Sequence, residues 1–448
     1  MSNSNWLKRD LEVLWHPCTQ MKDHEQLPLT PIQSGAGVWL KDFDGNRYLD
    51  AISSWWVNLF GHANPRINRA VKAQLDQLEH VILAGFSHEP AITLAEKLVE
   101  ITPRGLDKCF YADNGSSAIE VALKMSFHYW RNLGQTRKTK FISLRNSYHG
   151  ETLGALAVGD VALYKETYEP LLMQSITVES PDCYYRAEGQ SWEDYSRAQI
   201  IPMLEALKQH HENVAAVIVE PLVQCAGSMR MYHPVYLELL REACDQYNVH
   251  LIADEIAVGF GRTGTLFACE QAHISPDFMC LSKGLTGGYL PLSVTLTTQK
   301  VYDAFYDDYE NLTAFLHSHS YTGNALACSA ALETISIFET DNIIENNKSK
   351  AKLIKALCED LQEHPNVAEV RQTGMITAIE MCKDKKTKTP FSWQERRGLK
   401  VYQHGLKHEV LLRPLGNVVY FMPPYIISEE EIKLMVEVAR QGIKLATE

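Results

Sequence analysis

Short apolar runs alternate along the chain with longer stretches of helical period. The clearest runs lie at residues 109–112, 141–144, 214–219, 249–253 and 278–281. Continuous apolar runs bounded by polar or turn residues are typical of buried parallel strands. Between them, apolar residues recur near every 3.6 positions over 119–130 and 236–243, which predicts amphipathic helices. The alternation predicts an α/β fold with a mainly parallel central sheet.

The two ends of the chain have a different pattern. From about residue 330 we expect a long helical stretch, alternation around Gly374 over 367–380, another helix and an apolar run over 410–422. Residues 1–60, with the turn-rich KDFDGNRYLD at 41–50, predict an irregular arm that ends in a hairpin. We therefore predict an arm and part of a small domain in 1–60, a large domain in 61–329 and a smaller α+β domain in 330–448.

Composition and charge narrow the functional classes. The 448 residues include 43 Lys plus Arg against 55 Asp plus Glu, a net charge of -12, which argues against a nucleic-acid partner. The ten cysteines show no CxxC pair and no metal-ligand spacing, so reduced thiols are expected. No apolar run approaches the roughly 18 residues of a membrane helix, and the N-terminus lacks a signal-peptide pattern. We expect a cytoplasmic protein that acts on small molecules, without a metal or a membrane partner.

The first candidate for chemistry is DNGSS at 113–117, which joins a predicted strand to a predicted helix. Ligands bind at such strand ends in open α/β sheets. Ser117 and Glu120 fit a capping box, which is a purely structural interpretation. Gly115 and Ser116, together with the helix N-terminus, would also suit a phosphate. Both interpretations can hold together.

The second candidate is LIADEIAVGFGRTG at 251–264, where an apolar run delivers Asp254 and Glu255 to the end of a strand. A buried carboxylate needs a compensating partner. Gly259, Gly261 and Gly264 spell GxGxxG, and a nicotinamide-dependent reductase built on them is one alternative. The acidic residues precede the glycines and no clear helical period follows, so we expect these glycines to shape a tight loop instead.

The third candidate is DFMCLSKGLTGGYLPL at 277–292, where a lysine follows a buried strand and precedes a glycine-rich turn. Taken alone, Lys283 could be a solvated surface residue. Pyridoxal phosphate needs a lysine amine for its aldehyde, a carboxylate for its ring nitrogen and a cradle for its phosphate. Lys283, Asp254, and Gly115 with Ser116 would supply these three groups.

These motifs give the whole chain a resemblance to the class III, fold type I aminotransferases, which depend on pyridoxal phosphate. WHPCTQM at 15–21, SSWWVNLFGH at 53–62, NSYHG at 146–150, DEIAVGFGRTG at 254–264 and RPLGNVVYFMPPY at 413–425 are the most specific segments. They are most similar to the branch that aminates 8-amino-7-oxononanoate on the way to biotin. The resemblance implies a fold type I large domain, a smaller α+β domain and a homodimer with active sites at the subunit interface.

The resemblance also implies roles for individual residues. Lys283 would bind the cofactor and move the proton, Asp254 would hold the ring nitrogen, and Tyr148 would flank the ring. Gly115 and Ser116 match the phosphate-binding pair, and His319 and Ser320 match positions that reach the phosphate from the neighbouring subunit. The residues implied on the substrate side are Cys18, Trp55, Arg262, Ser318 and Arg413.

From their chemistry alone, some of these residues have simpler interpretations. Trp55 and Trp56 could be core aromatics and Arg413 a surface ion pair, although an arginine fork suits a carboxylate. His317 and His319 could be mistaken for a metal pair, but no third ligand is near in sequence.

Two positions depart from the best-known form of the family and affect the amino donor. Cys18 stands where a tyrosine or phenylalanine is usual, and Ser318 where glycine is usual. S-adenosylmethionine is the favoured donor, while lysine stays open because HSHSYTGN at 317–324 and YDDYENL at 306–312 are more similar to a lysine-using branch. Three further functions stay open: a class III enzyme for an ω-amino acid or diamine, an aminomutase, and a non-catalytic protein that binds the vitamin.

Overall fold

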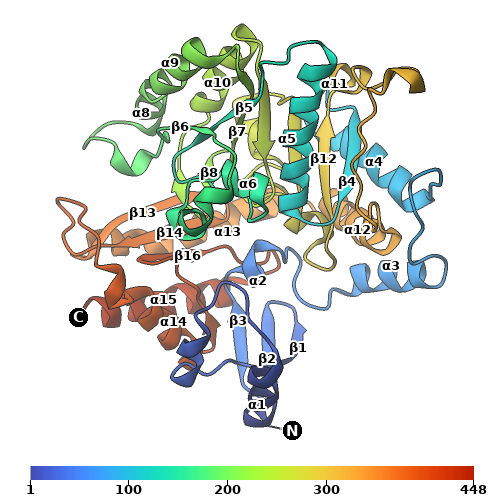
Figure 1. Cartoon of the computed structure of the whole chain (residues 1–448). Helices are drawn as coiled ribbons and strands as arrows, with labels where there is room; N and C mark the ends of the chain where they lie inside the picture. Colours follow the sequence, from blue (N-terminus) through green and yellow to red (C-terminus); the bar gives the residue numbers. More distant parts are fainter. Residues whose placement is uncertain (1) are drawn as a thin grey trace.

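The computed structural model describes residues 2–448, and within them the largest sheet has seven strands in the order β4-β12-β11-β10-β7-β5-β6 (Figure 1). Strands β11, β10, β7, β5 and β6 pair in parallel, whereas β12 is antiparallel to both β11 and β4. The mainly parallel sheet predicted from the apolar runs is confirmed. The strands are β4 (Lys108–Ala112), β5 (Lys140–Leu144), β6 (Ile176–Val178), β7 (Val214–Val219), β10 (His250–Asp254), β11 (Phe278–Leu281) and β12 (Ser293–Thr297).

Both faces of this sheet are covered, which explains why strands such as β7 and β11 are continuously apolar. Alternate residues of β11 point to opposite faces: Phe278 and Cys280 join the cluster under α5 (Gly115–Asn132), and Met279 and Leu281 join the larger core. Helices α10 (Val235–Gln246) and α12 (Ala325–Thr340) contribute to that larger core. The sheet is therefore the middle layer of the large part of the molecule.

A second region contains segments from both ends of the chain. The hairpin strands β1 (Ile32–Ala36), β2 (Trp39–Asp42) and β3 (Arg47–Asp50) form a sheet that β15 (Val410–Leu411) completes by pairing in parallel with β3. A further sheet has the order β13-β14-β16. Its strands and the helices of this region are β13 (Val367–Thr373), β14 (Ile376–Met381), β16 (Val418–Phe421), α13 (Ile343–Cys358), α14 (Arg397–Lys407) and α15 (Glu429–Thr447).

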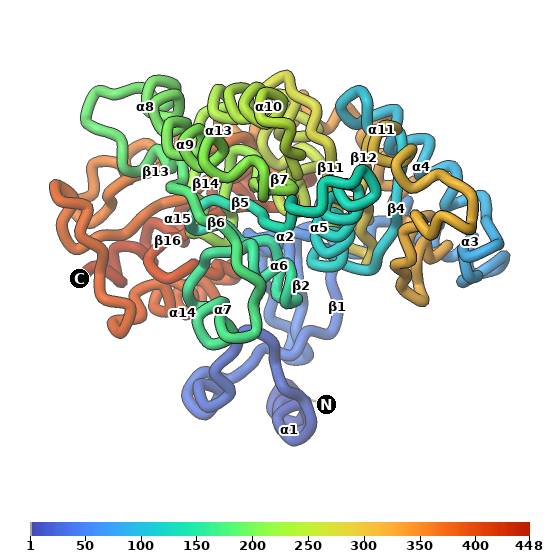
Figure 2. The backbone as a smooth tube through the Cα atoms, turned by 45° about the horizontal axis from the view of Figure 1, so that its top comes forward, coloured from blue at the N-terminus to red at the C-terminus, as the bar shows by residue number. Residues whose placement is uncertain are grey.

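Figure 2 shows the blue N-terminal segment, with α1 (Asn3–Val13), projecting from the body of the molecule. Among residues 2–448, no helix is both long enough and apolar enough to cross a membrane. The remaining α-helices and strands are α2 (Ser53–Trp56), α3 (Pro65–Leu75), α4 (Glu89–Ile101), α6 (Leu153–Ala157), α7 (Ala162–Lys165), α8 (Trp192–Ala198), α9 (Ile201–His210), α11 (Gln299–Asp303), β8 (Val223–Gln224) and β9 (Arg230–Met231).

Candidate active site

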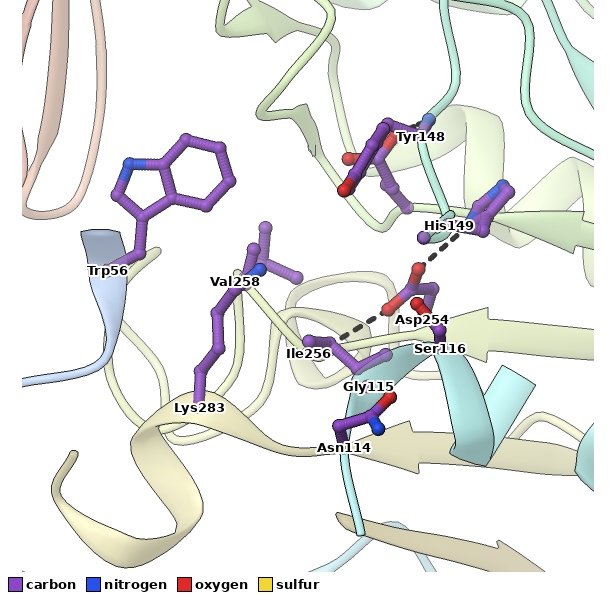
Figure 3. Close-up of a pocket in the computed structure, with 13 residues that line it drawn as sticks. Trp56, Asn114, Gly115, Ser116, Tyr148, His149, Asp254, Ile256, Val258 and Lys283 are labelled. Atoms are coloured by element: carbon purple, nitrogen blue, oxygen red, sulfur yellow. Dashed lines mark hydrogen bonds and ion pairs between the residues drawn. The ribbon is translucent and has the colours of Figure 1, made fainter. Parts of the chain in front are cut away.

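A pocket of about 200 Å³ lies where β4, β7, β10 and β11 end (Figure 3). Carboxyl ends of strands that run in the same direction meet at one edge of the sheet, which is where α/β folds place ligands. Segments far apart in the sequence therefore face one cavity. Its lining residues are Trp56, Asn114, Gly115, Ser116, Tyr148, His149, Gly150, Glu220, Asp254, Ile256, Ala257, Val258 and Lys283.

Lys283 follows β11 directly and turns into the pocket. Its backbone has a φ of +45°, in the left-handed region that is unfavourable for a residue with a side chain. The neighbouring Ser282 hydroxyl donates to the carbonyl of Leu292 at 2.8 Å and fixes the end of the strand. The Lys283 amine lies 4.8 Å from the centre of the Trp56 ring. Exclusion of water lowers the pKa of this amine, so it gives up its proton more readily than a surface lysine.

Asp254, at the end of β10, is only 4% exposed, and its two oxygens are held separately. The His149 ring lies with Nδ1 2.7 Å from Oδ2, and the backbone N–H of Ile256 donates to Oδ1 at 3.1 Å. The His149 side chain is fully buried. A carboxylate anchored in this way has a fixed orientation toward the pocket, where it can accept from a cationic group.

Glu220 is a site residue that the sequence reasoning missed. It follows β7 directly, and its carboxylate accepts from the backbone N–H groups of Tyr148 at 2.9 Å and Cys225 at 3.0 Å. Burial, and next the Asp254 carboxylate, raise the pKa of Glu220 to about 8, while those hydrogen bonds and Lys283 oppose the shift. The signal was available, because Glu220 ends a buried apolar run in the same way as Asp254.

The N-terminus of α5 faces the pocket, but its cap differs from the predicted one. The side-chain oxygen of Asn114 accepts from the backbone N–H of Ser117 at 3.1 Å, so the cap is Asn114 and the expected Ser117–Glu120 capping box is wrong. Glu120 instead accepts from the backbone N–H of Gly154 at 2.7 Å. The displaced cap leaves Gly115 and Ser116 in the first turn, next to the pocket.

Tyr148 links the pocket wall to its rim. Its backbone N–H is bound to Glu220, and its hydroxyl donates to Glu151 Oε1 at 2.8 Å. The backbone N–H of Glu151 donates in turn to the Ser116 hydroxyl at 3.2 Å. Tyr148, His149 and the start of α5 are thereby fixed relative to one another.

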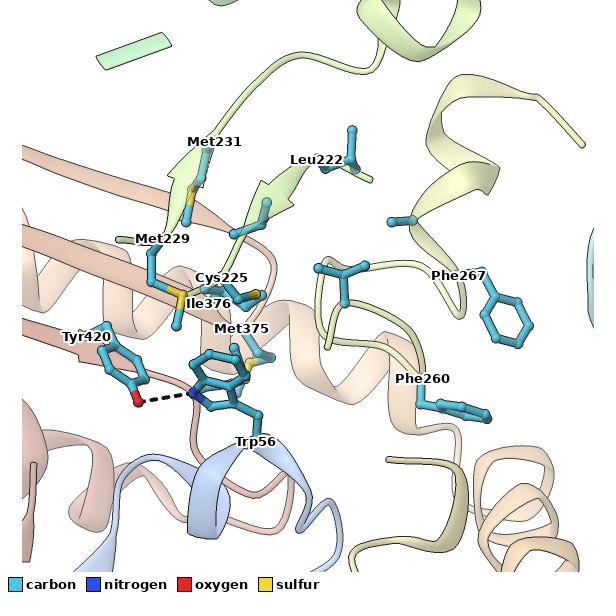
Figure 4. Packing of buried hydrophobic residues seen from close by; sticks show 14 of the residues in the cluster. Trp56, Leu222, Cys225, Met229, Met231, Phe260, Phe267, Met375, Ile376 and Tyr420 are labelled. Atoms are coloured by element: carbon cyan, nitrogen blue, oxygen red, sulfur yellow. Dashed lines mark hydrogen bonds between the residues drawn. The ribbon is translucent and has the colours of Figure 1, made fainter. Parts of the chain in front are cut away.

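The two tryptophans lie on a left-handed turn, since Ser53, Ser54, Trp55 and Trp56 all have φ between +46° and +73°. Backbone of this kind persists only where its surroundings hold it. The Ser53 hydroxyl donates to the Met422 carbonyl at 2.7 Å. The Trp56 ring N–H lies 3.0 Å from the Tyr420 hydroxyl, within the packing drawn in Figure 4.

The predicted substrate residue Arg262 binds the backbone of this turn. Its guanidinium is almost fully buried and donates to the backbone carbonyls of Trp56 at 3.2 Å, Asn58 at 3.1 Å and Pro423 at 2.9 Å. It is not one of the residues that line the pocket within the described chain. Arg413 lies with its guanidinium 4.7 Å from the ring centre of Trp55, which is 38% exposed.

The remaining predicted residues lie outside the pocket of their own chain. The Cys18 thiol is exposed, with Sγ 3.7 Å from the Tyr164 hydroxyl. His319 Nδ1 lies 3.1 Å from Asp113 Oδ2, and Ser318 and Ser320 are exposed. In the part of the chain that the structure describes, no group of three or more His, Cys, Asp or Glu side chains is arranged to hold a metal ion.

The segment after β10 forms turns, with no helix opening at Gly259, Gly261 or Gly264. The interpretation of these glycines as a tight loop is confirmed. A dinucleotide fingerprint requires a helix N-terminus at this point.

Known proteins resemble the chain over nearly its full length. The model of the family "Aminotransferase class-III" matches residues 20–443. The adenosylmethionine-8-amino-7-oxononanoate aminotransferase of Helicobacter pylori is 51% identical and is aligned over 95% of both chains. The crystal structure of the enzyme of that name from Methanocaldococcus jannaschii superposes with a TM-score of 0.93 at 40% identity and 99% coverage of both chains. An omega transaminase of Pseudomonas jessenii in complex with PMP gives 0.93 at 30% identity and 98% coverage of both chains. The chain therefore belongs to the class III aminotransferases.

Proposed function

We propose that this protein is a pyridoxal-phosphate-dependent aminotransferase that converts 8-amino-7-oxononanoate into 7,8-diaminononanoate in biotin biosynthesis. The observation that carries the reaction type is one juxtaposition: the Lys283 amine and the Asp254 carboxylate, anchored by His149, line the same pocket. The substrate is supported by the names of relatives that are 51% and 44% identical to the chain over nearly all of its length.

The pocket residues fit the proposed cofactor. Asp254 offers a fixed negative charge to a protonated ring nitrogen, and Gly115 and Ser116 offer the N-terminus of α5 to a phosphate. A Cβ added at Gly115 would lie 3.0 Å from Ile256 Cγ2, so a larger residue would have to displace the Ile256 side chain at the pocket wall. When bound, pyridoxal phosphate supplies an electron sink for the carbon that loses its proton.

Lys283 would perform the proton transfer. Its lowered pKa favours the neutral amine, which can accept the α proton of the donor and return it at another atom. The Trp56 ring limits the position of the amine on one side. Asp254 would keep its orientation throughout, because the His149 ring and the Ile256 N–H each hold one of its oxygens.

On the substrate side, Arg413 on the face of Trp55 would bind the carboxylate of the oxo acid, since a guanidinium can contact both oxygens. Arg262 would act through the tryptophan turn. We infer S-adenosylmethionine as the amino donor, with lysine as the competing possibility because of Cys18 and Ser318.

We further propose that the protein works as a homodimer in the cytoplasm, divided into the arm at 1–60, the large domain at 61–329 and the small domain at 330–448. His319 and Ser320 would then reach the phosphate in the partner's site. Their positions outside the pocket of their own chain are compatible with this arrangement.

The test is the visible spectrum of the purified protein, with borohydride trapping followed by peptide mass analysis. The proposal expects a coloured cofactor that borohydride fixes to Lys283. In a separate, untreated sample one donor should bleach the colour and 8-amino-7-oxononanoate should restore it. Lys283→Arg, which keeps a long basic side chain but removes the amine, provides the control and should trap nothing.

A colourless protein, or an adduct on another lysine, would overturn the proposed site. Bleaching by a simple ω-amine, without colour return on adding the oxo acid, would favour the omega transaminases to which the fold is also similar.

A further inference from the structure

Tyr164, on the short helix α7, lies at the rim of the site between two different parts of the chain. Its hydroxyl is 3.7 Å from the thiol of Cys18, which belongs to the N-terminal arm. Its ring meets the ring of Tyr148 edge-on, with 5.4 Å between their centres. Since Tyr148 lines the pocket, Tyr164 is one side chain away from the cavity.

Charges of opposite sign act on the Tyr164 hydroxyl. Burial raises its pKa most, followed by the Cys18 thiol and the Glu151 carboxylate, whereas Arg413 opposes the shift. Glu151 is the residue that binds the Tyr148 hydroxyl, and Arg413 is the one that lies on Trp55. The phenol is therefore neutral at physiological pH.

A neutral phenol with this contact has acceptor capacity to spare. A thiol at 3.7 Å is a weak hydrogen-bond partner, so the oxygen lone pairs of Tyr164 can still bind a stronger donor. The Glu151 carboxylate, which binds the neighbouring Tyr148 hydroxyl, attracts a cation against the repulsion from Arg413. An ammonium group, which carries a positive charge and donates hydrogen bonds, suits both this carboxylate and the free lone pairs of Tyr164.

We propose that Tyr164 is a specificity-determining residue whose hydroxyl accepts a hydrogen bond from the non-reacting ammonium group of an amino substrate. The inference rests on the proposed function and refines it. The oxo acid carries such a group on the carbon next to its reacting carbonyl. Neither candidate donor has an ammonium group at that place: lysine carries its second one at the far end of its chain, and S-adenosylmethionine carries a sulfonium, which has no N–H to donate.

The experiment compares Tyr164→Phe with the wild type in each half-reaction, measured separately. Phenylalanine keeps the ring against Tyr148 and removes only the hydroxyl. Tyr168→Phe, at a half-exposed tyrosine of the same segment, is the matched control. The spectrum of the Lys283-bound cofactor and the thermal midpoint establish that each variant is folded and loaded.

A hydrogen bond to a charged group predicts that Tyr164→Phe raises KM for the oxo acid by roughly tenfold or more, with kcat little changed. Neither S-adenosylmethionine nor lysine should lose affinity, because neither has an ammonium group next to its reacting carbon. Equal KM values for the oxo acid in the wild type and Tyr164→Phe would overturn the inference, as would an equal loss in Tyr168→Phe. Failure of the wild type to bleach with any donor would instead refute the proposed function.

Discussion

Side chains in this site depend on the hydrogen bonds that orient them as much as on their own charge. The Asp254 carboxylate is buried, and its orientation depends on the His149 ring at 2.7 Å and one backbone N–H. A hydrogen bond to a charged group contributes more than one between neutral groups. His149 should therefore be a positioning residue whose loss affects the reaction without touching the substrate.

The corresponding variant is His149→Leu, which leaves Asp254 Oδ2 without this partner. We expect kcat to fall by roughly 10- to 100-fold while KM for both substrates changes little. His149→Asn, which can still donate to Oδ2, should recover part of the loss. Steady-state kinetics of the three proteins check this, and equal kcat values in His149→Leu and the wild type would contradict it.

A second residue with an unusual environment is Glu255, next to Asp254 but facing away from the pocket. It is fully buried and accepts from the backbone N–H groups of Ala268 at 2.9 Å and Cys269 at 2.8 Å. Burial raises its pKa from 4.5 to about 7, against the effect of these hydrogen bonds. The folded protein therefore holds a proton that the unfolded chain releases.

This difference makes stability depend on pH with a definite sign. Between pH 4.5 and about 7 the folded state binds more protons at Glu255, so its contribution to stability decreases as the pH rises and levels off above that window. The thermal midpoint of Glu255→Gln should vary less with pH over this range than that of the wild type. The exposed Glu188→Gln is the control, and parallel pH profiles for all three proteins would refute the prediction.

Among the elements, the loop after β5 and the first turn of α5 must fit closely together. Gly150 has a φ of +121°, and a Cβ at this position would overlap the Ser116 hydroxyl. Gly189 also has a positive φ, +77°, but its added Cβ would meet nothing within 4 Å. Comparing substitutions at the two glycines therefore separates the effect of backbone strain from the effect of the contact with Ser116.

Gly150→Ala should displace Ser116 from the pocket and weaken cofactor retention by roughly tenfold or more, equivalent to about 1.4 kcal/mol. Gly189→Ala should lower the free energy of unfolding only through backbone strain, by on the order of 1–3 kcal/mol, which a lower thermal midpoint would show. Titration of the apoprotein with pyridoxal phosphate measures the first effect. Equal cofactor affinity in the two variants would show that the contact with Ser116 does not matter.

How far the sequence predicts an element depends on how local its causes are. Strands β7 and β11 coincide with the predicted apolar runs because both faces of the sheet are buried. Strand β12 was missed, since its alternating SVTLT follows a glycine-rich turn and is buried only through pairing with β4 and β11.

How far the site can be predicted from the sequence also depends on how local its causes are. The pocket residues Lys283, Asp254, Tyr148, Gly115 and Ser116 could be named from strand ends and family motifs, and the structure brings them together. The cap at Asn114 could not be told from one at Ser117, because both side chains can cap and the choice depends on where β4 ends. The anchoring of Asp254 by His149 joins residues 105 positions apart and had no local signal.

At the scale of the whole molecule, exposed apolar side chains gather on two projecting segments. Trp15 on the N-terminal arm is 87% exposed, and Leu316 in the segment before His319 is 93% exposed. Large exposed apolar side chains are typical of protein interfaces. They support the proposed homodimer, in which each site borrows residues from its partner.

Mixing two inactive variants tests this sharing of residues. Lys283→Ala lacks the amine, and the double variant His319→Ala with Ser320→Ala lacks the residues proposed to come from the partner. A mixed dimer contains one site with neither defect, so random exchange should restore roughly a quarter of the wild-type activity. Activity that stays at the level of the separate variants, after subunit exchange has been verified, would show that the residues do not cross the interface.

The parallel pairing of β3 with β15 has a consequence for how the protein is made. Strand β3 ends at residue 50 and β15 begins at residue 410, so the partner of β3 leaves the ribosome long after β3 does. At typical rates of synthesis this delay is roughly 20 to 70 s. During that time the hairpin presents an unpaired strand edge to the cell, and this edge is open to association with other chains. Translation speed between these two positions thus becomes a determinant of yield that no substitution in the pocket would reveal.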